Sequence, residues 1–255
     1  SAAASSSANT VSSAGESSVA ASSETGVSSS EAISSSSAVD ASSSLVAESS
    51  SVEASSSSIA DESSSSVSSA SDDDIDFSKF TDPSLRACVE QTGVTKISEL
   101  VYLNCIRLDI SDSVGVEQLT ELTELHLAYN NLTEIASNAF QNCSNLKNLR
   151  VEYNFLKTVP EAISGAKSLR SLHISHNSLT EISDGDFTSL KNLRHLDMSN
   201  NVIRSLCENC LKDLNLIEVL DMSMNELASI PHNSFDTNLG LKLLRLDGNK
   251  LTDVN

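Results

Sequence analysis

The sequence predicts an α/β solenoid: a stack of short parallel strands with a helical cap before the first turn and a disordered tail before the cap. Three observations support this fold class. A pattern of apolar residues recurs six times between Leu122 and Val254, at intervals of 23 or 24 residues. A short segment before the first turn has the signals of a helix. Nearly a third of the 255 residues have a composition that cannot form a core.

Residues 1–76 are the predicted tail, an acidic linker rich in Ser and Ala. Serine occupies 34 of the first 71 positions, and the tail has 12 acidic residues and neither Lys nor Arg. Its scattered valines follow no helical or strand period, so their burial cannot offset an ordering cost of about 1–2 kcal/mol per residue. We interpret the tail as a disordered spacer. The alternatives are a phosphorylated or glycosylated tract and a segment that binds a partner.

The charge distribution excludes some classes of protein. The formal net charge of −19 divides into −12 for residues 1–76 and −7 for residues 77–255, which hold 23 acidic and 16 basic residues. We do not expect a nucleic-acid-binding protein, because a phosphate backbone requires clustered Lys and Arg. We also expect no transmembrane segment, because no stretch approaches the ~18 apolar residues that a spanning helix needs.

Residues 77–96 are predicted to cap the repeats with a helix. Asp82 is a good N-cap, Pro83 suits the first helical position, and Gly93 would end the helix. Its apolar face would comprise Leu85, Cys88 and Val89. A solenoid requires such a cap because its first strand would otherwise expose the core.

Residues 97–255 are predicted to form the repeats, one degenerate turn followed by six regular ones. A regular turn reads Leu-x-x-Leu-x-Leu-x-x-Asn-x-Leu-x-x-Ile, with apolar replacements at some positions. Leu-x-Leu is a short strand with both leucines facing inward, and each turn places one strand about 4.8 Å from the last. In the degenerate turn, Leu108 stands in the position of the asparagine. The sixth regular turn has reached its last core position at Val254, so we expect the array to be truncated at its C-terminus.

The asparagine that follows each strand is predicted to bond the backbone of neighbouring turns. The stacked amides would form a ladder, because buried backbone groups require hydrogen-bond partners. Loss of one amide would leave such groups unpaired, at a cost of about 1–3 kcal/mol. The predicted ladder comprises Asn130, Asn154, Asn177, Asn201, Asn225 and Asn249.

These motifs resemble the leucine-rich repeat family over about residues 97–255. The resemblance implies a right-handed, horseshoe-shaped solenoid with a parallel sheet on its concave face. The cap motif Asp-Pro-x-Leu-Arg-x-Cys-Val is similar to caps of bacterial, internalin-like proteins, and the serine-rich linker resembles those of secreted or surface-tethered bacterial proteins. The return legs, by contrast, resemble the repeats of animal receptors. The cap and linker favour a bacterial source, with a possible lipid anchor upstream of Ser1.

The cysteines predict disulfide bonds and an oxidising compartment. Cys88 on the cap helix and Cys105 on the strand beneath it would close a loop of about 17 residues, worth about 3 kcal/mol. Two buried free thiols are the alternative. Cys207 and Cys210 are expected on an exposed outer leg, joined by a local disulfide or left as free thiols, because zinc would need two more ligands nearby. Cys143 replaces a core leucine and is interpreted as an apolar filler.

The outward-facing strand residues predict the binding surface. A further row, which begins with Ala128 and Glu152, is expected to be exposed beside the outward-facing strand residues. Tyr129, Tyr153 and His176 would stack along one edge of the sheet. Tyr and Arg most often carry interface energy, so we expect a protein or peptide ligand. The predicted partner-binding residues are His126, Tyr129, Arg150, Tyr153, His173, His176, Asp197 and Asp221.

No motif in the sequence predicts catalysis, a cofactor or a metal site. The nucleophile elbow Gly-x-Ser-x-Gly, His-Glu-x-x-His and the phosphate-binding and dinucleotide-binding loops are absent from the sequence. The predicted function is a non-enzymatic protein-binding module, secreted or at the cell surface, that uses the concave face. The alternative is a glycan-binding or surface-attachment module linked to a polysaccharide-acting enzyme.

Overall fold

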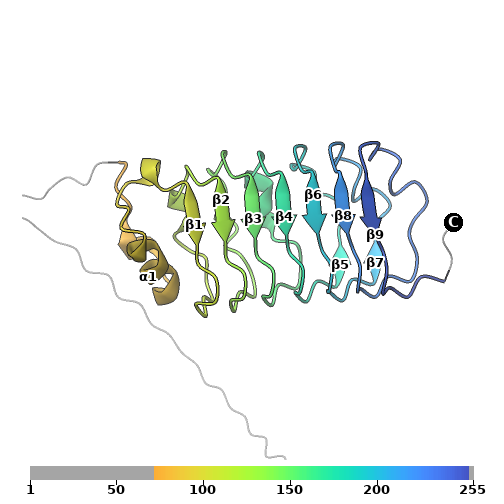
Figure 1. Cartoon of the computed structure of the whole chain (residues 1–255), viewed down its shortest axis with the longest axis horizontal. Helices are drawn as coiled ribbons and strands as arrows, with labels where there is room; N and C mark the ends of the chain where they lie inside the picture. The colour runs from red at the N-terminus through yellow and green to blue at the C-terminus, as the bar shows by residue number, and fades with distance from the viewer. Residues whose placement is uncertain (1–71, 253–255) are drawn as a thin grey trace, which may run out of the picture. The chain divides into compact units, whose positions relative to one another are not determined.

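The computed structural model describes residues 72–252, so the predicted disorder of residues 1–71 lies outside the described residues. Within residues 72–252, seven short strands form one parallel sheet, which confirms the predicted parallel-strand solenoid (Figure 1). The strands are β1 (Tyr102–Asn104), β2 (Glu124–His126), β3 (Asn148–Arg150), β4 (Ser171–His173), β6 (His195–Asp197), β8 (Val219–Asp221) and β9 (Leu243–Arg245).

The sheet order β1-β2-β3-β4-β6-β8-β9 follows the chain, so each turn of the solenoid lies beside the one before it. The central leucine of each strand pairs in register with that of the next, as Leu125 does with Leu149. This register follows from the nearly constant length of the turns, which returns the same side chain to the same face. In the return legs, β5 (Glu181–Ile182) and β7 (Ser205–Leu206) form a second parallel pair.

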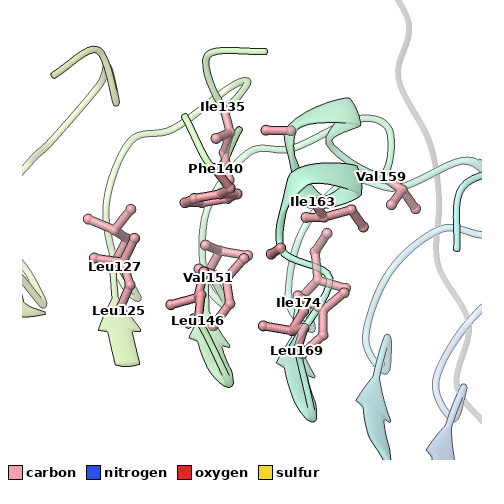
Figure 2. Close-up of a cluster of buried hydrophobic side chains, with 14 of the residues drawn as sticks. Leu125, Leu127, Ile135, Phe140, Leu146, Val151, Val159, Ile163, Leu169 and Ile174 are labelled. Atoms are coloured by element: carbon pink, nitrogen blue, oxygen red, sulfur yellow. The ribbon is translucent and has the colours of Figure 1, made fainter. Parts of the chain in front are cut away.

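Most return legs contain turns and short 3-10 helices rather than α-helices. The 3-10 segments of the described residues are η1 (Phe77–Lys79), η2 (Ile97–Glu99), η3 (Val116–Gln118) and η4 (Glu161–Gly165). Phe140 points back from these legs toward Val151 on the strand side, and Ile163 points toward Ile174 in the next turn (Figure 2). All four side chains are at most 1% exposed, so the core lies between the sheet and the return legs.

Asn238 replaces a leucine in the last return leg and still faces inward. It is 4% exposed, and its Nδ2 donates to the carbonyls of Leu211 (3.0 Å) and Leu214 (2.9 Å). The Nδ2 group is therefore partnered inside the core, whereas Oδ1 of Asn238 is buried without a hydrogen-bond partner among residues 72–252. Leu239, the next residue, is 92% exposed instead.

The asparagine ladder joins consecutive turns through their backbones. Asn154 accepts a hydrogen bond from the Leu132 N–H (3.0 Å), and its Nδ2 donates to the carbonyls of Leu127 (2.9 Å) and Val151 (3.1 Å). The same kind of bonding, to its own turn and to the turn before, recurs at Asn130, Asn177, Asn201, Asn225 and Asn249. Each amide thus satisfies groups that the bend after the strand leaves unpaired.

The cap helix α1 (Pro83–Gln91) begins at Asp82, and this residue also holds the helix to the first turn. One carboxylate oxygen accepts from the N–H groups of Ser84 (2.9 Å) and Leu85 (3.0 Å), and the other accepts from the Ser111 N–H (2.8 Å). Burial raises the pKa of Asp82, but these hydrogen bonds outweigh it and hold the pKa below its usual value.

A disulfide joins the cap helix to the first strand of the sheet. It links Cys88 to Cys105, whose Cα atoms are 5.8 Å apart. Both residues are at most 6% exposed. The covalent bond therefore lies within the seam that the helix covers.

The folded part extends further toward the N-terminus than the expected boundary at residue 76. Ile75 is 5% exposed in the core, and its N–H donates to the Thr95 carbonyl (2.8 Å). Asp74 pairs with Lys96 through an antiparallel bridge and an ion pair. The acidic composition of residues 72–76 hid this pairing, because Ile75 is their only apolar residue and the other contacts are hydrogen bonds and an ion pair of the aspartates.

Candidate binding face

The central row of the sheet face contains the third residue of each strand from β2 onward. Pairing in register places His126, Arg150, His173, Asp197, Asp221 and Arg245 next to one another in that order. Basic, acidic and imidazole side chains therefore lie in one row. We call this surface, with the aromatic column described next, the sheet face.

Four residues stack in an aromatic column along one side of the sheet face. The Tyr129 and Tyr153 rings lie 4.1 Å apart at 8°, and the Tyr153 and His176 rings lie 3.9 Å apart at 9°. The guanidinium of Arg107 covers the Tyr129 ring, 4.3 Å from its centroid. The two tyrosines are 39% and 38% exposed, so the edges of the column face solvent.

The backbone fixes the spacing of this column. Tyr129, Tyr153 and His176 have left-handed φ values of 56°, 57° and 52°, and the N–H of each donates to a carbonyl of the next turn. A hydrogen bond with the Tyr129 side chain, together with desolvation, raises the pKa of the Tyr153 hydroxyl. The sequence did not identify Arg107 as part of the column, although it immediately precedes Leu108, which stands in the ladder position.

The row expected to be exposed beside the central row is buried instead. Five of its six members, Ala128, Glu152, Ser175, Ser199 and Ser223, are at most 8% exposed, and only Asp247 in the last turn is exposed as expected. The side chains of the central row cover it. The Asp197 carboxylate, for example, accepts hydrogen bonds from the N–H (3.0 Å) and hydroxyl (2.7 Å) of Ser199.

Arg150 already has a carboxylate partner from its own chain. Its Nε and Nη2 donate to Oε1 of the buried Glu152, at 2.9 and 2.5 Å. Two of the three guanidinium nitrogens of Arg150 are therefore already bonded within the chain. Burial, followed by the charge of Arg150, lowers the pKa of the neighbouring His126.

His173 lies between two polar neighbours. Ser171 Oγ is 2.9 Å from His173 Nε2, and His173 Nδ1 is 3.8 Å from a carboxylate oxygen of Asp197. Burial raises the pKa of Asp197, but hydrogen bonds from His173 and Ser199 outweigh it and hold the pKa well below its usual range. The Ser171 N–H donates to the Lys147 carbonyl (3.0 Å), so it is not free to stabilise an oxyanion as an acyl-transfer site requires.

A shallow hollow of about 350 Å³ lies on the sheet face beside these residues. Its floor and walls mix the charged Asp197, Asp221 and Arg245 with the apolar Val219 and Leu243. Among residues 72–252, no cluster of His, Cys, Asp and Glu side chains has the arrangement of a metal site. The mixed charged and apolar lining of the hollow can accept a side chain of a ligand through ionic and apolar contacts.

The Cys207–Cys210 pair is less exposed than the sequence indicated. The two residues are joined by a disulfide, and Cys210 is only 5% exposed. Its sulfur takes the place that the Asp186 carboxylate has one turn earlier, and it accepts from the Cys207 N–H at 2.9 Å. This turn geometry directs the side chain inward. Cys143 is a buried free thiol whose pKa burial raises to about 11.

Comparison with known proteins agrees with the repeat geometry. The leucine rich repeat family matches residues 120–179 and 167–227. No curated protein matches the chain. The structure of internalin C2 from Listeria monocytogenes is similar to this chain at 22% identity and a TM-score of 0.49, covering 71% of this chain and 91% of that one.

A second similar structure is the ectodomain of the plant membrane receptor kinase GASSHO1/SCHENGEN3 from Arabidopsis thaliana, in complex with CASPARIAN STRIP INTEGRITY FACTOR 2. It is 24% identical, with a TM-score of 0.49, over 55% of this chain and 17% of that one. No helix within residues 72–252 is long and apolar enough to span a bilayer. The repeated motif, the stack of parallel strands and the family match over residues 120–227 together show a leucine-rich repeat protein.

Proposed function

We propose that this chain is a non-enzymatic protein-binding module that works outside the cell or at its surface, and that the sheet face is its binding surface. The aromatic column carries this proposal, because it gathers Arg107, Tyr129, Tyr153 and His176 into one exposed strip. Tyr and Arg are enriched among the residues that dominate binding energy.

The column is ordered before any partner arrives. Each ring of Tyr129 and Tyr153 is held between two neighbours, so little side-chain entropy remains to be lost on binding. Ordering a side chain at an interface otherwise costs about 0.5–1.5 kcal/mol. The exposed ring edges and hydroxyls can therefore contact a protein or peptide at a small entropic cost.

The same stacking argues against a glycan as the ligand of the column. Sugars bind aromatic residues by lying against a ring face. Both faces of Tyr129 are covered, by Arg107 and by Tyr153, and both faces of Tyr153 are covered, by Tyr129 and by His176. We therefore favour a protein or peptide ligand over a polysaccharide.

The disulfides support an oxidising compartment. Cys88–Cys105 and Cys207–Cys210 are both joined within the described residues, and such bonds persist mainly outside the cytosol. We propose secretion or surface display on this ground. Attachment through a lipid upstream of Ser1 is part of the same proposal, and labelling of growing cells with a radioactive fatty acid would test it.

The proposal is tested by selecting peptides from a phage-displayed library on the full-length chain. We expect Tyr153→Ala to weaken the selected peptides by more than about 1 kcal/mol, the usual threshold for an important contact. Calorimetric titration measures the loss. Thermal unfolding should show a destabilisation of at most about 1–3 kcal/mol, from the two lost ring stacks, which leaves the chain folded at the temperature of the titration.

Lys157→Ala is the matched control, because Lys157 is exposed and makes no ion pair within the described part of the chain. Its binding should equal that of the unmodified chain. Equal losses in the two variants would contradict a role for the sheet face. A glycan array that retains the chain, with retention abolished by Tyr153→Ala, would instead favour the attachment module.

A further inference from the structure

Unpaired basic side chains gather at one edge of the solenoid. Most Lys and Arg residues in the described part of the chain form ion pairs, and Arg107 stacks on a tyrosine. Among residues 72–252, six make neither contact. Four of these six lie just before β3, β4 and β6, namely Lys147, Lys167, Arg170 and Lys191. We call these four residues the basic edge.

The basic edge is continuous in space. The Arg170 N–H donates to the Lys147 carbonyl (2.8 Å), and the Arg194 N–H donates to the Arg170 carbonyl (2.9 Å), so these residues occupy the same position in consecutive turns. Asn192 Nδ2 similarly bonds the Lys167 carbonyl of the preceding turn (3.0 Å). All four basic residues are exposed.

No acidic residue occurs in the three chain segments that form this edge, 144–149, 167–172 and 191–196. The domain as a whole is acidic, with a net charge of −7 over residues 77–255. Like charges on adjacent turns repel one another, so the fold gains nothing from their clustering. An anionic partner bound at this edge would offset that repulsion.

Two carboxylates flank the basic edge, and both are already bonded within the chain: Glu121 accepts from Asn145 Nδ2 (3.0 Å), and Glu218 pairs with Arg194 and Lys242. In the next two turns the same edge also carries two exposed leucines. Leu216 occupies the position of Asn192 one turn later and is 43% exposed. Leu239 occupies the position of Lys191 two turns later and is 92% exposed. A sulfated polysaccharide would make no use of these two side chains. A polypeptide can place acidic residues over the basic edge and an apolar residue over the leucines.

We propose that this edge is a second binding site, which takes an extended acidic segment of a partner protein that ends in an apolar residue. The site runs along four steps between turns, from Lys147 to Leu239, or about 19 Å at about 4.8 Å per step. An extended chain covers this length with about six residues at about 3.3 Å each. Charge complementarity would set the orientation and speed of association.

This site is distinct from the sheet face, because its residues precede the strands and none belongs to the aromatic column. The proposal therefore does not rest on the function assigned to the tyrosines. Tyr153→Ala serves as the test of independence. It should leave binding at the edge unchanged.

The experiment uses the full-length chain and a fluorescein-labelled peptide of glutamates followed by leucines, about six residues long. Fluorescence anisotropy is measured at an ionic strength of about 0.1 M, where charges within about 10 Å still interact. We expect the double variant Lys167→Glu/Lys191→Glu to weaken binding at least about tenfold, because repulsion replaces attraction.

The matched control is Lys79→Glu/Lys157→Glu, which makes the same change in net charge at exposed, unpaired lysines elsewhere. It should change the affinity less than about twofold. Leu239→Ser should weaken the leucine-bearing peptide and leave a peptide with serines in place of the leucines unaffected. Thermal unfolding of each variant verifies that the fold is retained.

Three results would overturn the proposal. Equal losses in the two double variants would assign binding to net charge alone. Loss of peptide binding in Tyr153→Ala would assign it to the sheet face. Binding of dextran sulfate but not of the peptide, abolished by Lys167→Glu/Lys191→Glu, would assign the edge to a sulfated polysaccharide instead.

Discussion

Asn201 is bonded to the backbone of its own turn and of the turn before, so its removal tests how the ladder stabilises the solenoid. Its Oδ1 accepts from the Leu179 N–H (3.0 Å), and its Nδ2 donates to the carbonyls of Ile174 (3.2 Å), Met198 (3.0 Å) and Ser199 (3.3 Å). The residue is 7% exposed, and water cannot readily take its place.

Asn201→Ala would leave the Leu179 N–H without its acceptor in a buried site, at about 1–3 kcal/mol, and would remove further bonds worth about 1 kcal/mol each. We expect the free energy of unfolding to fall by about 3–5 kcal/mol, because the two hydrogens of Nδ2 supply two full bonds in addition to the accepted one. For a domain of this size the thermal midpoint should fall by about 6–20 °C. Urea unfolding followed by circular dichroism measures the free energy, and a temperature scan measures the midpoint.

Asn249→Ala is the matched comparison. Asn249 makes the same kind of bonds, with the Leu227 N–H (3.0 Å) and with the carbonyls of Met222 (2.9 Å) and Leu246 (2.8 Å), but it is only partly buried. Water can replace some of these bonds, so its loss should cost about 1 kcal/mol. Equal costs at Asn201 and Asn249 would refute the argument that burial makes the ladder stabilising.

Three further measurements test the seam, the free thiol and the central row. The double variant Cys88→Ser/Cys105→Ser should lower the free energy of unfolding by about 3 kcal/mol in urea, because the bond closes a loop of about 17 residues; an unchanged value would contradict this role. Cys143, whose pKa burial raises to about 11, should remain a protonated thiol that iodoacetamide does not modify without denaturant, and mass spectrometry would reveal any native labelling. Asp197 has a pKa below its ordinary 3.8, so it stabilises the fold above that pH and the contribution is lost as the pH falls through the folded-state pKa. Asp197→Asn should therefore flatten the acid side of the stability profile, and an unaltered profile would show that this carboxylate does not contribute.

The solenoid could be predicted from the sequence because its constraints are local and repeated. The strand leucines and the ladder asparagines recur at nearly constant intervals, so each turn must present the same groups to its neighbours. The stacking of Tyr129, Tyr153 and His176 follows from the same register. The cap helix was predictable from Asp82 and Pro83, which fix its first turn.

The features that the sequence did not predict depend on single contacts that do not recur from turn to turn. Glu152 is buried because the Arg150 side chain folds over it, and a polar residue between two exposed positions gives no sign of this. Cys210 turns inward because its sulfur accepts from the Cys207 N–H, as a carboxylate does one turn earlier. Ile75 lies in an acidic run that otherwise resembles the tail.

The left-handed position before each ladder asparagine links the fold to the proposed binding. The backbone at this position has φ between 52° and 57° in five consecutive turns, and Gly248 occupies it in the next with φ of 71°. A side chain there costs about 1–2 kcal/mol, so glycine is the residue that stability alone would favour. Tyr129, Tyr153 and His176 nevertheless occupy it in three successive turns, and each stacked pair offsets only about 0.5–1.5 kcal/mol. Strained positions tend to be held where the side chain has a functional role. The left-handed conformation therefore raises the energy of the fold, and it also places the aromatic column on the exposed surface that we propose as the binding site.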